Sequence, residues 1–482
     1  MAKFYITNAI PYVNAKPHVG HALEFVQSDV IARYHKILGD EVLLLCGGDE
    51  NALKNVQAAE KAGEPIQEFV DKNTQLFFAL SKKLNVQFDV WQKGSSAQHH
   101  LASQKLWELC NANGDIYKKS YTGLYCVGCE LFYEPDELNE NGECYEHPGK
   151  KLEEVSEENY FFRLSKYTEQ IRELLEKDII QITPASRKNE ALGFVKEGLQ
   201  DISISRSNAR AKNWGVPVPG DNSQRMYVWF DALNIYQSGV GFGSDEKKYE
   251  KWWPADVHVI GKGIIKFHAL YWPAFLLSAK LSLPKSIFAH GYFTVNGQKM
   301  SKSLGNVVDP VEIINKYGTD VFRYYVLSNI PSTADGDFSE ERLKEVYNAD
   351  LANGLGNLVA RVAKLCETAG FTLTGSGDHS STHVVDAKAY KLALEEYRFN
   401  DAISFIWQKI READKFIDEE KPWNMLKDGN ERLKDVLTHA IDSIQEITGL
   451  LEPFLPETAE KIAAQFKGPQ IKSAAPLFPR LS

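Results

Sequence analysis

Residues 4–48 decide the fold, and their sequence is FYITNAIPYVNAKPHVGHALEFVQSDVIARYHKILGDEVLLLCGG. Phe4–Ala9 has the apolar content of a strand, and the prolines of residues 11–17 prevent that segment from being helical throughout. Apolar residues then recur at helical spacing over residues 23–37. Residues 41–46 are a compact apolar run, which is typical of a buried parallel strand. The order strand, loop, helix and strand predicts the βαβ unit of a nucleotide-binding sheet.

The rest of the chain is predicted to be an interrupted sheet followed by helices. Residues 117–219 break the strand–helix alternation with a Cys-rich and Glu-rich stretch, which we interpret as an insertion. Three short apolar runs then restore the strand signal, at residues 226–230, 257–260 and 287–289. From residue 339 onward strand signals nearly vanish, and helical patterns such as those of residues 401–419 and 433–447 dominate.

Composition and charge limit the class of protein. A chain of 482 residues is too long for one hydrophobic core, so two to four domains are expected. The absence of any apolar run of about 18 residues excludes a transmembrane helix, and the polar N-terminus does not resemble a secretory signal. A cytoplasmic protein is therefore expected, and the clustering of three of the six cysteines agrees with this. The net charge of −10 argues against general affinity for nucleic acid but not against one specific RNA partner.

The first candidate site is His18-Val19-Gly20-His21, where the first loop enters the first helix. Histidines three apart project from the same side of a helical turn, and free N–H groups at a helix N-terminus attract anions. Gly20 leaves space for a flat ring close to the backbone. Two surface histidines beside a helix-starting glycine explain these four residues equally well when they are taken alone.

The second candidate site is Lys299-Met-Ser-Lys302-Ser, on a short polar loop after a turn at Asn296-Gly297. Two lysines three apart on such a loop can close over a triphosphate. The ordinary alternative is a solvated basic loop. The two motifs together, each at a suitable place in a split nucleotide-binding fold, favour the phosphate-binding interpretation.

The two motifs resemble the signatures of class I aminoacyl-tRNA synthetases, and the resemblance to the methionyl-tRNA synthetase family covers nearly the whole chain. It is also carried by Ala9–His21, Met226–Ala232 and His258–His268. It implies an α/β fold in which a Rossmann-like parallel-sheet catalytic domain is split by a zinc-binding insertion and followed by an all-α anticodon-binding helix bundle. The implied division is 1–116 and 226–295 for the catalytic halves, 117–225 for the insertion, 296–345 for the phosphate loop and stem-contact region, and 346–482 for the bundle.

The resemblance also implies the substrate sites. ATP with Mg²⁺ would lie between the two motifs, on His18, Gly20, His21, Lys299, Ser301 and Lys302, and the histidines and lysines would be catalytic. Asp49 would bind the α-ammonium group of methionine. The methionine side chain would pack among Ile10, Tyr12, Trp229, Ala232, Leu233, Tyr236, Ile264 and His268. Aromatic rings suit a thioether, although core packing is the usual role of a single Trp or Tyr.

Two positions depart from the family pattern. The segment Asp49-Glu50-Asn51-Ala52 stands where the family usually has Asp-Glu-His-Gly, and Gly263 stands where an acidic residue usually follows Gly-Lys. Contacts around the ribose or the ammonium group are therefore expected to differ.

The cysteine cluster predicts a metal site. Cys126-Val-Gly-Cys129 is followed by Cys144-Tyr-Glu-His147, and each pair has the two-residue spacing of a zinc knuckle. Three thiolates and one imidazole leave no open coordination position, so the Zn²⁺ is expected to be structural. Reduced core cysteines are the alternative. The other three cysteines, Cys46, Cys110 and Cys366, are expected in cores or on a helix.

An RNA site is predicted in the helical region. Asn357 and Arg361 are four apart and share a helix face, and Trp423 follows Lys421-Pro422 just past another helix. In the family these positions meet the anticodon, with the Trp as a stacking platform, and a flat indole suits an unstacked base. A core Trp beside a surface Arg is the alternative interpretation.

The resemblance thus implies activation of methionine with ATP and its transfer to tRNA(Met). Three rivals remain: a class I synthetase for another amino acid such as cysteine, a nucleotidyltransferase that never meets tRNA, and an inactive RNA-binding relative. Because the chain stops soon after the helical region, without the extra tRNA-binding barrel through which some family members dimerise, a monomer is expected.

Overall fold

A six-stranded parallel sheet lies at the centre of the N-terminal part of the chain. The structure is a computed structural model, and it describes residues 2–126, 131–133, 135–146, 148–300, 306–373 and 387–481. The strand order is β3 (Val90–Lys93), β2 (Glu41–Gly48), β1 (Lys3–Asn8), β12 (Val257–Gly261), β13 (Ser286–His290) and β7 (Gln181–Thr183). The order changes direction between β1 and β12. In open α/β sheets, ligands bind in the crevice beyond the carboxyl ends of the strands at such a switch point.

The strands of this sheet supply two hydrophobic cores, one on each face. Neighbouring residues of a strand point to opposite faces, so Ile6 and Leu44 enter one core while Tyr5 and Leu45 enter the other. The strands predicted at residues 4–9, 41–46, 257–260 and 287–289 are therefore confirmed as β1, β2, β12 and β13.

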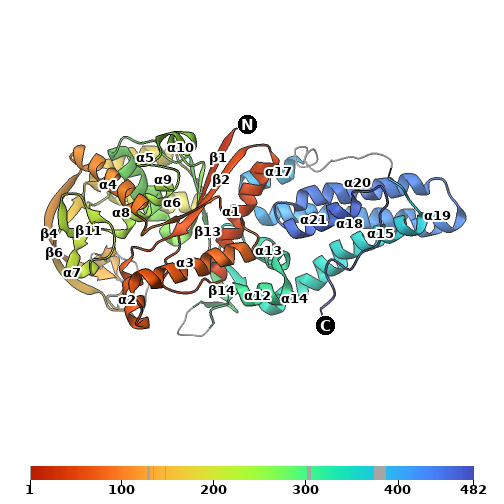
Figure 1. The fold of residues 1–482 in the computed structure, drawn as a ribbon, viewed down its shortest axis with the longest axis horizontal. Helices are drawn as coiled ribbons and strands as arrows, with labels where there is room; N and C mark the ends of the chain where they lie inside the picture. Colours follow the sequence, from red (N-terminus) through yellow and green to blue (C-terminus); the bar gives the residue numbers. More distant parts are fainter. Residues whose placement is uncertain are drawn as a thin grey trace.

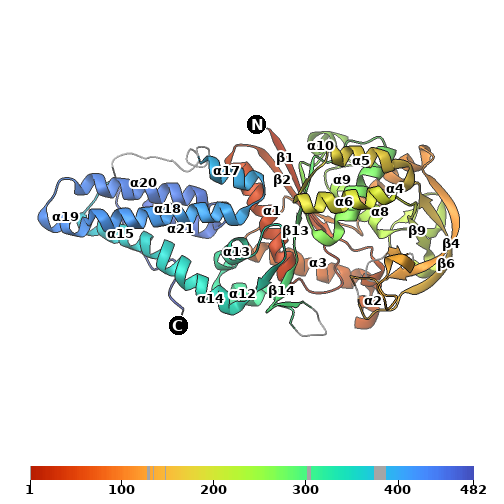
Figure 2. The same ribbon diagram turned by 180° about the vertical axis from the view of Figure 1, so that it is seen from behind.

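Helices cover both faces of the sheet (Figures 1 and 2). The face of Ile6 is covered by α1 (Val19–Ile37) and α3 (Ile66–Lys83), with α2 (Leu53–Ala62) beside them. The opposite face is covered by α4 (Ala97–Ala112), α8 (Val228–Ala232), α9 (Ile235–Ser238), α10 (Glu246–Trp252) and α11 (Trp272–Ser278). The predicted helix over residues 23–37 is confirmed as the greater part of α1.

The predicted insertion forms the outer end of this half of the molecule. A four-stranded antiparallel sheet contains β5 (Leu131–Tyr133), β4 (Ile116–Cys126), β6 (Glu153–Phe162) and β8 (Ile202–Ser203). A smaller sheet contains β10 (Pro217–Val218), β11 (Asp221–Met226) and β9 (Ser205–Ser207). The helices of this region are α5 (Thr168–Glu176), α6 (Ala185–Glu197) and α7 (Asn208–Ala211).

Two features of this region differ from the sequence-based expectation. The short strand β7 lies inside the predicted insertion but pairs with β13 at the edge of the central sheet. The strand predicted at residues 226–230 is wrong, because β11 ends at Met226 and residues 228–232 form the helix α8. Short apolar runs that are buried on all sides show neither helical nor strand periodicity, so the pattern could not distinguish the two.

A connecting region joins the sheet to the helical bundle. It contains β14 (Phe293–Val295), β15 (Gln298–Lys299) and β16 (Gly336–Phe338), together with α12 (Pro310–Tyr317), α13 (Thr319–Ser328) and α14 (Glu340–Val346). The bundle then extends away from the sheet as η5 (Tyr347–Gly356), α15 (Asn357–Ala369), α17 (Lys388–Glu395), α18 (Phe399–Glu420), α19 (Pro422–Asp428), α20 (Leu433–Leu451) and α21 (Pro456–Phe466) (Figure 1). The helices predicted over residues 401–419 and 433–447 are confirmed as α18 and α20.

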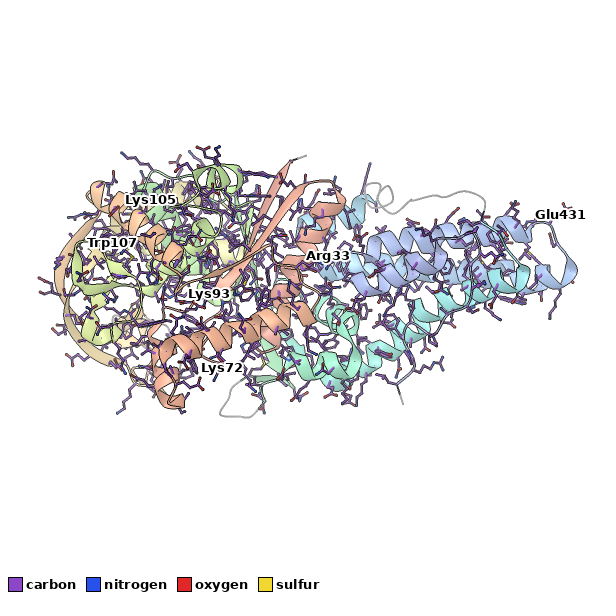
Figure 3. All side chains as sticks on the ribbon, viewed as in Figure 1. Arg33, Lys72, Lys93, Lys105, Trp107 and Glu431 are labelled. Carbon is purple, nitrogen blue, oxygen red and sulfur yellow. The ribbon has the colours of Figure 1, made fainter. Side chains whose placement is uncertain are left out.

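A buried arginine joins the bundle to the half of the molecule that contains the central sheet. Arg323 of α13 is fully buried and donates to the carbonyl oxygens of Pro453 and Phe454, between α20 and α21, at 2.9 and 2.8 Å. It also forms a 2.8 Å ion pair with Asp29 of α1, which Arg33 binds in turn at 2.7 Å. Figure 3 shows Arg33 at this junction and Glu431 at the far tip of the bundle. One continuous hydrophobic core runs from α1 through α13 into α18 and α20.

None of the helices in the described part of the chain is long and apolar enough to cross a membrane.

Candidate active site

The His18–His21 motif forms the N-terminus of α1. The ring Nδ1 of His18 accepts from the backbone N–H of Gly20 at 3.1 Å, and Nδ1 of His21 accepts from the N–H of His18 at 3.1 Å. The two rings lie 3.9 Å apart. A Cβ atom at position 20 would lie only 2.9 Å from the His18 ring, so a side chain there would displace the ring that caps the helix.

The first turn of α1 differs from expectation in one respect. Its N–H groups already have acceptors: Gly20 uses the His18 ring, His21 uses the His18 carbonyl, and Val19 uses the carbonyl of Val308 at 3.3 Å. The expected free N–H groups are therefore absent from this turn. Burial, together with the neighbouring His18 and His290, holds the pKa of His21 well below its usual value, so its ring is neutral at pH 7.

The second motif begins on β15, after a turn in which Asn296 and Gly297 both have positive φ. The structure describes only the main chain of Lys299, and Ser301 and Lys302 lie outside the described residues. The bond between Val19 and Val308 brings the segment just after this motif against the start of α1.

The nine residues predicted to surround methionine line a single small cavity. They are Ile10, Tyr12, Asp49, Trp229, Ala232, Leu233, Tyr236, Ile264 and His268. They come from the carboxyl-end loops of β1, β2 and β12 and from α8 and α9, that is, from the switch-point edge of the sheet. The volume open to water is about 10 Å³, roughly what one water molecule needs. A longer side chain therefore enters only if the walls move apart.

Aromatic rings and one histidine form the walls of this cavity. Trp229 stacks on Phe267 with a ring distance of 3.6 Å, and Tyr12 meets Trp229 edge-on at 6.2 Å. The backbone carbonyl of Ile264 accepts from Nδ1 of His268 at 3.0 Å, so Nε2 accepts from the Tyr236 hydroxyl at 2.8 Å. Burial lowers the pKa of His268 to about 4, which keeps its ring neutral.

Asp49 occupies the end of β2 beside β1. Its N–H donates to the Pro11 carbonyl at 2.9 Å, its own carbonyl accepts from the Asn55 amide at 2.8 Å, and it forms a bridge with Tyr12. Only 4% of Asp49 is exposed. A carboxylate is thus held at the rim of an apolar cavity, the arrangement that an ammonium group beside an apolar chain requires.

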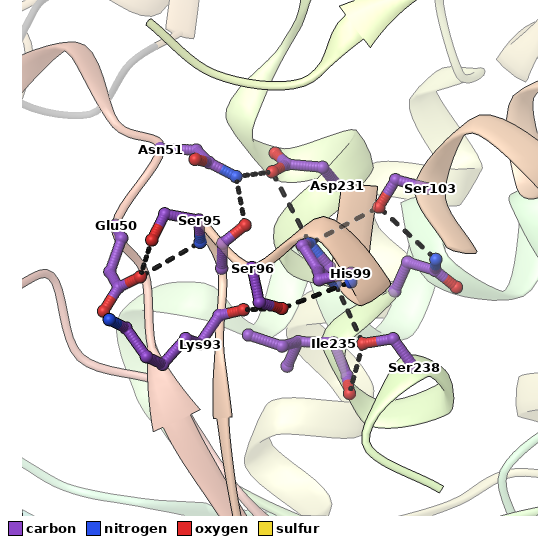
Figure 4. A network of polar contacts seen from close by, with 12 residues as sticks. Glu50, Asn51, Lys93, Ser95, Ser96, His99, Ser103, Asp231, Ile235 and Ser238 are labelled. Carbon is purple, nitrogen blue, oxygen red and sulfur yellow. Dashed lines mark hydrogen bonds and ion pairs between the residues drawn. The ribbon is translucent and has the colours of Figure 1, made fainter. Parts of the chain in front are cut away.

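A buried polar network lies next to Asp49 (Figure 4). Glu50 accepts from the hydroxyls of Thr74 and Ser95 at 2.7 and 2.5 Å. The amide of Asn51 donates to Asp231 at 2.5 Å, and Nε2 of His99 lies 3.6 Å from the same carboxylate oxygen. Sequence reasoning did not assign Asp231, although an acidic residue within the apolar run of residues 228–233 was a usable signal.

Gly263 is required by its neighbour Tyr292. A Cβ atom at position 263 would lie 1.8 Å from the Tyr292 hydroxyl oxygen, so no other residue fits without displacing this ring. The Tyr292 ring also lies 5.1 Å from the Lys262 ammonium, which pairs with Asp335 at 2.8 Å. Gly263, at a position where the family usually has an acidic residue, therefore leaves room for the Tyr292 hydroxyl.

A second, larger cavity of about 680 Å³ lies against the insertion. Alternate residues of two paired strands form one wall: Tyr117, Lys119 and Tyr125 of β4 with Glu157, Asn159 and Phe161 of β6. Tyr117 and Tyr125 are eight residues apart on one strand, or about 26 Å at about 3.3 Å per residue. The cavity is therefore an elongated trough. Tyr227, two residues before Trp229, and Tyr271 also line this larger cavity.

The trough combines aromatic rings with cationic side chains. The guanidinium of Arg210 lies 4.2 Å from the Tyr125 ring centre, and that of Arg206 lies 5.5 Å from it and 5.4 Å from the Tyr227 ring. At the Tyr117 end, the carboxylate of Asp201 accepts from the Tyr117 hydroxyl at 2.7 Å.

Two of the four predicted zinc ligands can be located. Cys126 at the end of β4 and Cys144 are buried with their sulfur atoms 3.2 Å apart, and both are reduced. Cys129 and His147 lie outside the described residues, and no group of three metal-binding side chains occurs among those that the structure does describe. Cys46 and Cys110 are fully buried, as expected, and Cys366 lies on the helix α15, as expected, where it is also buried.

The predicted anticodon residues lie together on the bundle. Asn357 is the first residue of α15 and is exposed, and Arg361 follows one turn later. The Arg361 guanidinium lies 5.9 Å from the ring centre of Trp423, which begins α19 with Pro422 and is 37% exposed. Arg361 also pairs with Asp414 at 3.1 Å and Asp418 at 2.6 Å. Trp423 is therefore not a core residue.

Comparisons with known proteins agree with this architecture. Residues 4–363 match the family described as tRNA synthetases class I (M). The methionine–tRNA ligase of Brucella suis is 40% identical over 471 residues, which cover 95% of this chain and 91% of the relative. That of Thermotoga maritima is 41% identical and covers 95% of this chain and 74% of the relative.

A solved structure shares the whole fold. The Mycobacterium tuberculosis methionyl-tRNA synthetase in complex with methionyl-adenylate is 36% identical and superposes with a TM-score of 0.92, covering 100% of both chains. The family match and these relatives lead to one conclusion: the chain belongs to the methionine–tRNA ligases, within the class I tRNA synthetases.

Proposed function

We propose that this chain activates L-methionine with ATP and transfers it to tRNA(Met) at the switch-point edge of the sheet. The methionine carboxylate attacks the α-phosphate of ATP, which forms methionyl-adenylate and releases pyrophosphate. The terminal ribose hydroxyl of the tRNA then attacks the activated carbonyl and displaces AMP. The observation that carries the proposal is the cavity of nine predicted residues, which adjoins the end of β1 from which the chain enters the His18–His21 motif.

The cavity suits methionine by shape and by polarity. Thioether sulfur interacts favourably with aromatic rings, and Tyr12, Trp229 and Tyr236 line the apolar part. Asp49 at the rim would bind the α-ammonium group. The neutral His268, held by Tyr236 and Ile264, adds no charge that would disfavour an uncharged side chain.

ATP would lie between the two signature motifs, with Mg²⁺ on its phosphates. His18, Gly20 and His21 would contact it from one side, and Lys299, Ser301 and Lys302 from the other. The contact between Val19 and Val308 supports this arrangement, because it brings the two chain segments together. Positioning and charge stabilisation then account for catalysis without a covalent enzyme intermediate.

The zinc site would be structural. Cys126 and Cys144 fit a tetrahedral thiolate site, because their buried sulfur atoms converge without forming a disulfide. Cys129 and His147 would complete one closed site per chain. Bound there, the metal would hold the β4 end of the insertion.

The tRNA would contact both ends of a monomeric protein. Asn357, Arg361 and Trp423 would bind the anticodon, with an unstacked base on the exposed indole. The trough, with Tyr125 and Tyr227 beside two arginines, would accept the unpaired 3′ end on its way to the methionine cavity. The five-part division of the chain remains our proposal for how these tasks are distributed.

The test is ATP–pyrophosphate exchange with each of the twenty amino acids and homocysteine. Methionine should give the fastest exchange. Homocysteine lacks only the terminal methyl group and should be a partial substrate, because one such group is worth about 1–3 kcal/mol of discrimination. Equal or greater specificity for cysteine would overturn the methionine assignment, and exchange without subsequent tRNA charging would favour a nucleotidyltransferase.

A further inference from the structure

We propose that Asn51 and Asp231 are a positioning pair, which holds the carboxylate of Asp49 at a fixed distance from the Trp229 side of the methionine cavity. The inference rests on the proposed function, because it assigns Asp49 to the substrate ammonium group. Neither residue of the pair lines the cavity itself. Asn51 acts through Asp49 and Asp231 acts through Trp229, in each case the residue two positions earlier in the chain.

The pair connects the two chain segments that build the site. Asn51 follows Asp49 by two residues at the end of β2, and Asp231 follows Trp229 by two residues in α8. Their side chains meet at 2.5 Å, although 180 residues separate them along the chain. This one bond therefore ties the ammonium-binding segment to the helix that carries the apolar wall (Figure 4).

The bond is partly buried, between a buried aspartate and a half-buried asparagine. Asp231 is 2% exposed, and its other close partner is the fully buried ring of His99 at 3.6 Å. The Asn51 amide also donates to the Gly94 carbonyl at 2.8 Å, so the two hydrogens of its NH₂ group have one acceptor each. A charge-assisted hydrogen bond that is partly shielded from water is among the stronger ones in a protein, which suits it to fixing a distance.

Asp49 itself is held by main-chain contacts that are separate from the bond between Asn51 and Asp231. Its main chain binds Pro11 and Asn55, and neither contact reaches α8. Loss of the Asn51 bond would therefore remove a direct link between the segment that carries Asp49 and the helix that carries Trp229. A misplacement of about 1 Å can cost about a hundredfold in an oriented site.

The proposal distinguishes ligands by their ammonium group. Methioninol keeps the ammonium group and the thioether but has an alcohol in place of the carboxylate. The compound 4-(methylthio)butanoate keeps the thioether and the carboxylate but has no amino group. If Asn51 acts by positioning Asp49, only ligands that carry the ammonium group depend on it.

The experiment measures the KM for methionine and the inhibition constants of both analogues in methionine-dependent ATP–pyrophosphate exchange. For Asn51→Ala, we expect the KM for methionine and the methioninol constant to rise about tenfold, the effect of weakening one hydrogen bond to a charged group. The constant for 4-(methylthio)butanoate should not change. Asp231→Asn keeps an oxygen acceptor for Asn51 and should stay within about threefold of wild type.

A double-mutant cycle tests whether the two residues act together. Asp231→Ala alone should match Asn51→Ala, and the double variant should be no worse than either single variant, because the same bond is lost in all three. Ser103→Ala is the matched control. Ser103 is fully buried in the same network, at 3.4 Å from His99, but does not contact Asn51 or Asp231. It should leave all three ligand constants unchanged.

The outcomes separate this proposal from the function itself. Equal weakening of all three ligands by Asn51→Ala, or no change in any, would overturn the positioning role. Additive effects of the two alanine substitutions would overturn the pairing. Absence of methionine-dependent exchange in the wild-type protein would instead refute the proposed function. Should Asn51→Ala fail to fold, Asn51→Ser also removes the amide and is measured in its place.

Discussion

At the scale of single residues, burial decides the chemistry of the histidines. His268 lines the methionine cavity with 1% exposure, and its pKa is lowered to about 4 because burial disfavours the charged ring. The ring can therefore hold one fixed tautomer between Tyr236 and Ile264. Sequence reasoning placed His268 in this cavity but could not supply its protonation state, which depends on desolvation by distant parts of the chain.

This lowered pKa predicts a pH dependence of stability. Between pH 4 and about 6.5, the unfolded chain binds a proton at His268 that the folded chain excludes, so the free energy of unfolding rises with pH in this window. From pH 7 to pH 5, His268 should cost the wild-type protein about 2 kcal/mol. His268→Gln should reduce the loss by that amount in urea unfolding at the two pH values. His439→Gln, at an exposed position, should behave like wild type, and equal losses in both variants would contradict the assignment.

At the scale of elements, the end of β4 is predicted to depend on the metal. Cys144→Ser should release one zinc per chain and lower the melting temperature, because a closed site ties metal binding to local folding. Metal analysis and thermal unfolding of reduced protein measure both effects. Cys366→Ser, which changes a buried cysteine of α15, should destabilise without loss of metal. Reduced wild-type protein without zinc would refute the site.

Sequence patterns predicted the elements in which the periodicity of apolar residues, or the residues that end an element, were clear. The apolar stripe of α1 and the compact apolar runs of β1 and β2 gave the βαβ unit, and the long stripes of α18 and α20 gave the bundle. The apolar run at residues 226–230 gave a wrong strand because burial on every side removes periodicity. β7 was missed because three residues carry no pattern, and its place depends on pairing with β13, about 100 residues later.

The same limit applies to the site. Residues that line the methionine cavity could be proposed from their motifs, and they do surround one cavity. The partners that hold these residues in place could not be proposed from the sequence, because a bond such as that between Asn51 and Asp231 joins segments 180 residues apart. The trough on β4 and β6 was missed for the same reason: its wall consists of alternate residues on two paired strands.

At the scale of the whole molecule, our proposal gives the two ends separable tasks. Trp423 lies on the bundle, and stacking of one base on an aromatic ring is worth about 1–3 kcal/mol. Trp423→Ala should therefore lower kcat/KM for tRNA charging by about ten- to a hundredfold. Methionine-dependent pyrophosphate exchange needs no tRNA and should stay close to wild type.

A core tryptophan of the same bundle provides the control for this experiment. Trp407 of α18 is 7% exposed and stacks on Tyr324 at 4.5 Å. Trp407→Ala should lower the melting temperature by several degrees and reduce both reactions. If Trp423→Ala behaved in that way, its indole would serve packing and not RNA.

The buried arginine at the junction has a consequence for how the two ends influence each other. Arg323 holds the turn between α20 and α21 and, through Asp29, the helix α1 that begins at the His18–His21 motif. Unfolding of the bundle would leave this guanidinium without two of its acceptors inside a core that both halves share. Whatever stabilises the folded bundle, including a bound RNA, therefore also stabilises the active-site helix. A tRNA bound to the bundle would then protect from unfolding the helix that begins the active site, before its 3′ end reaches the methionine cavity.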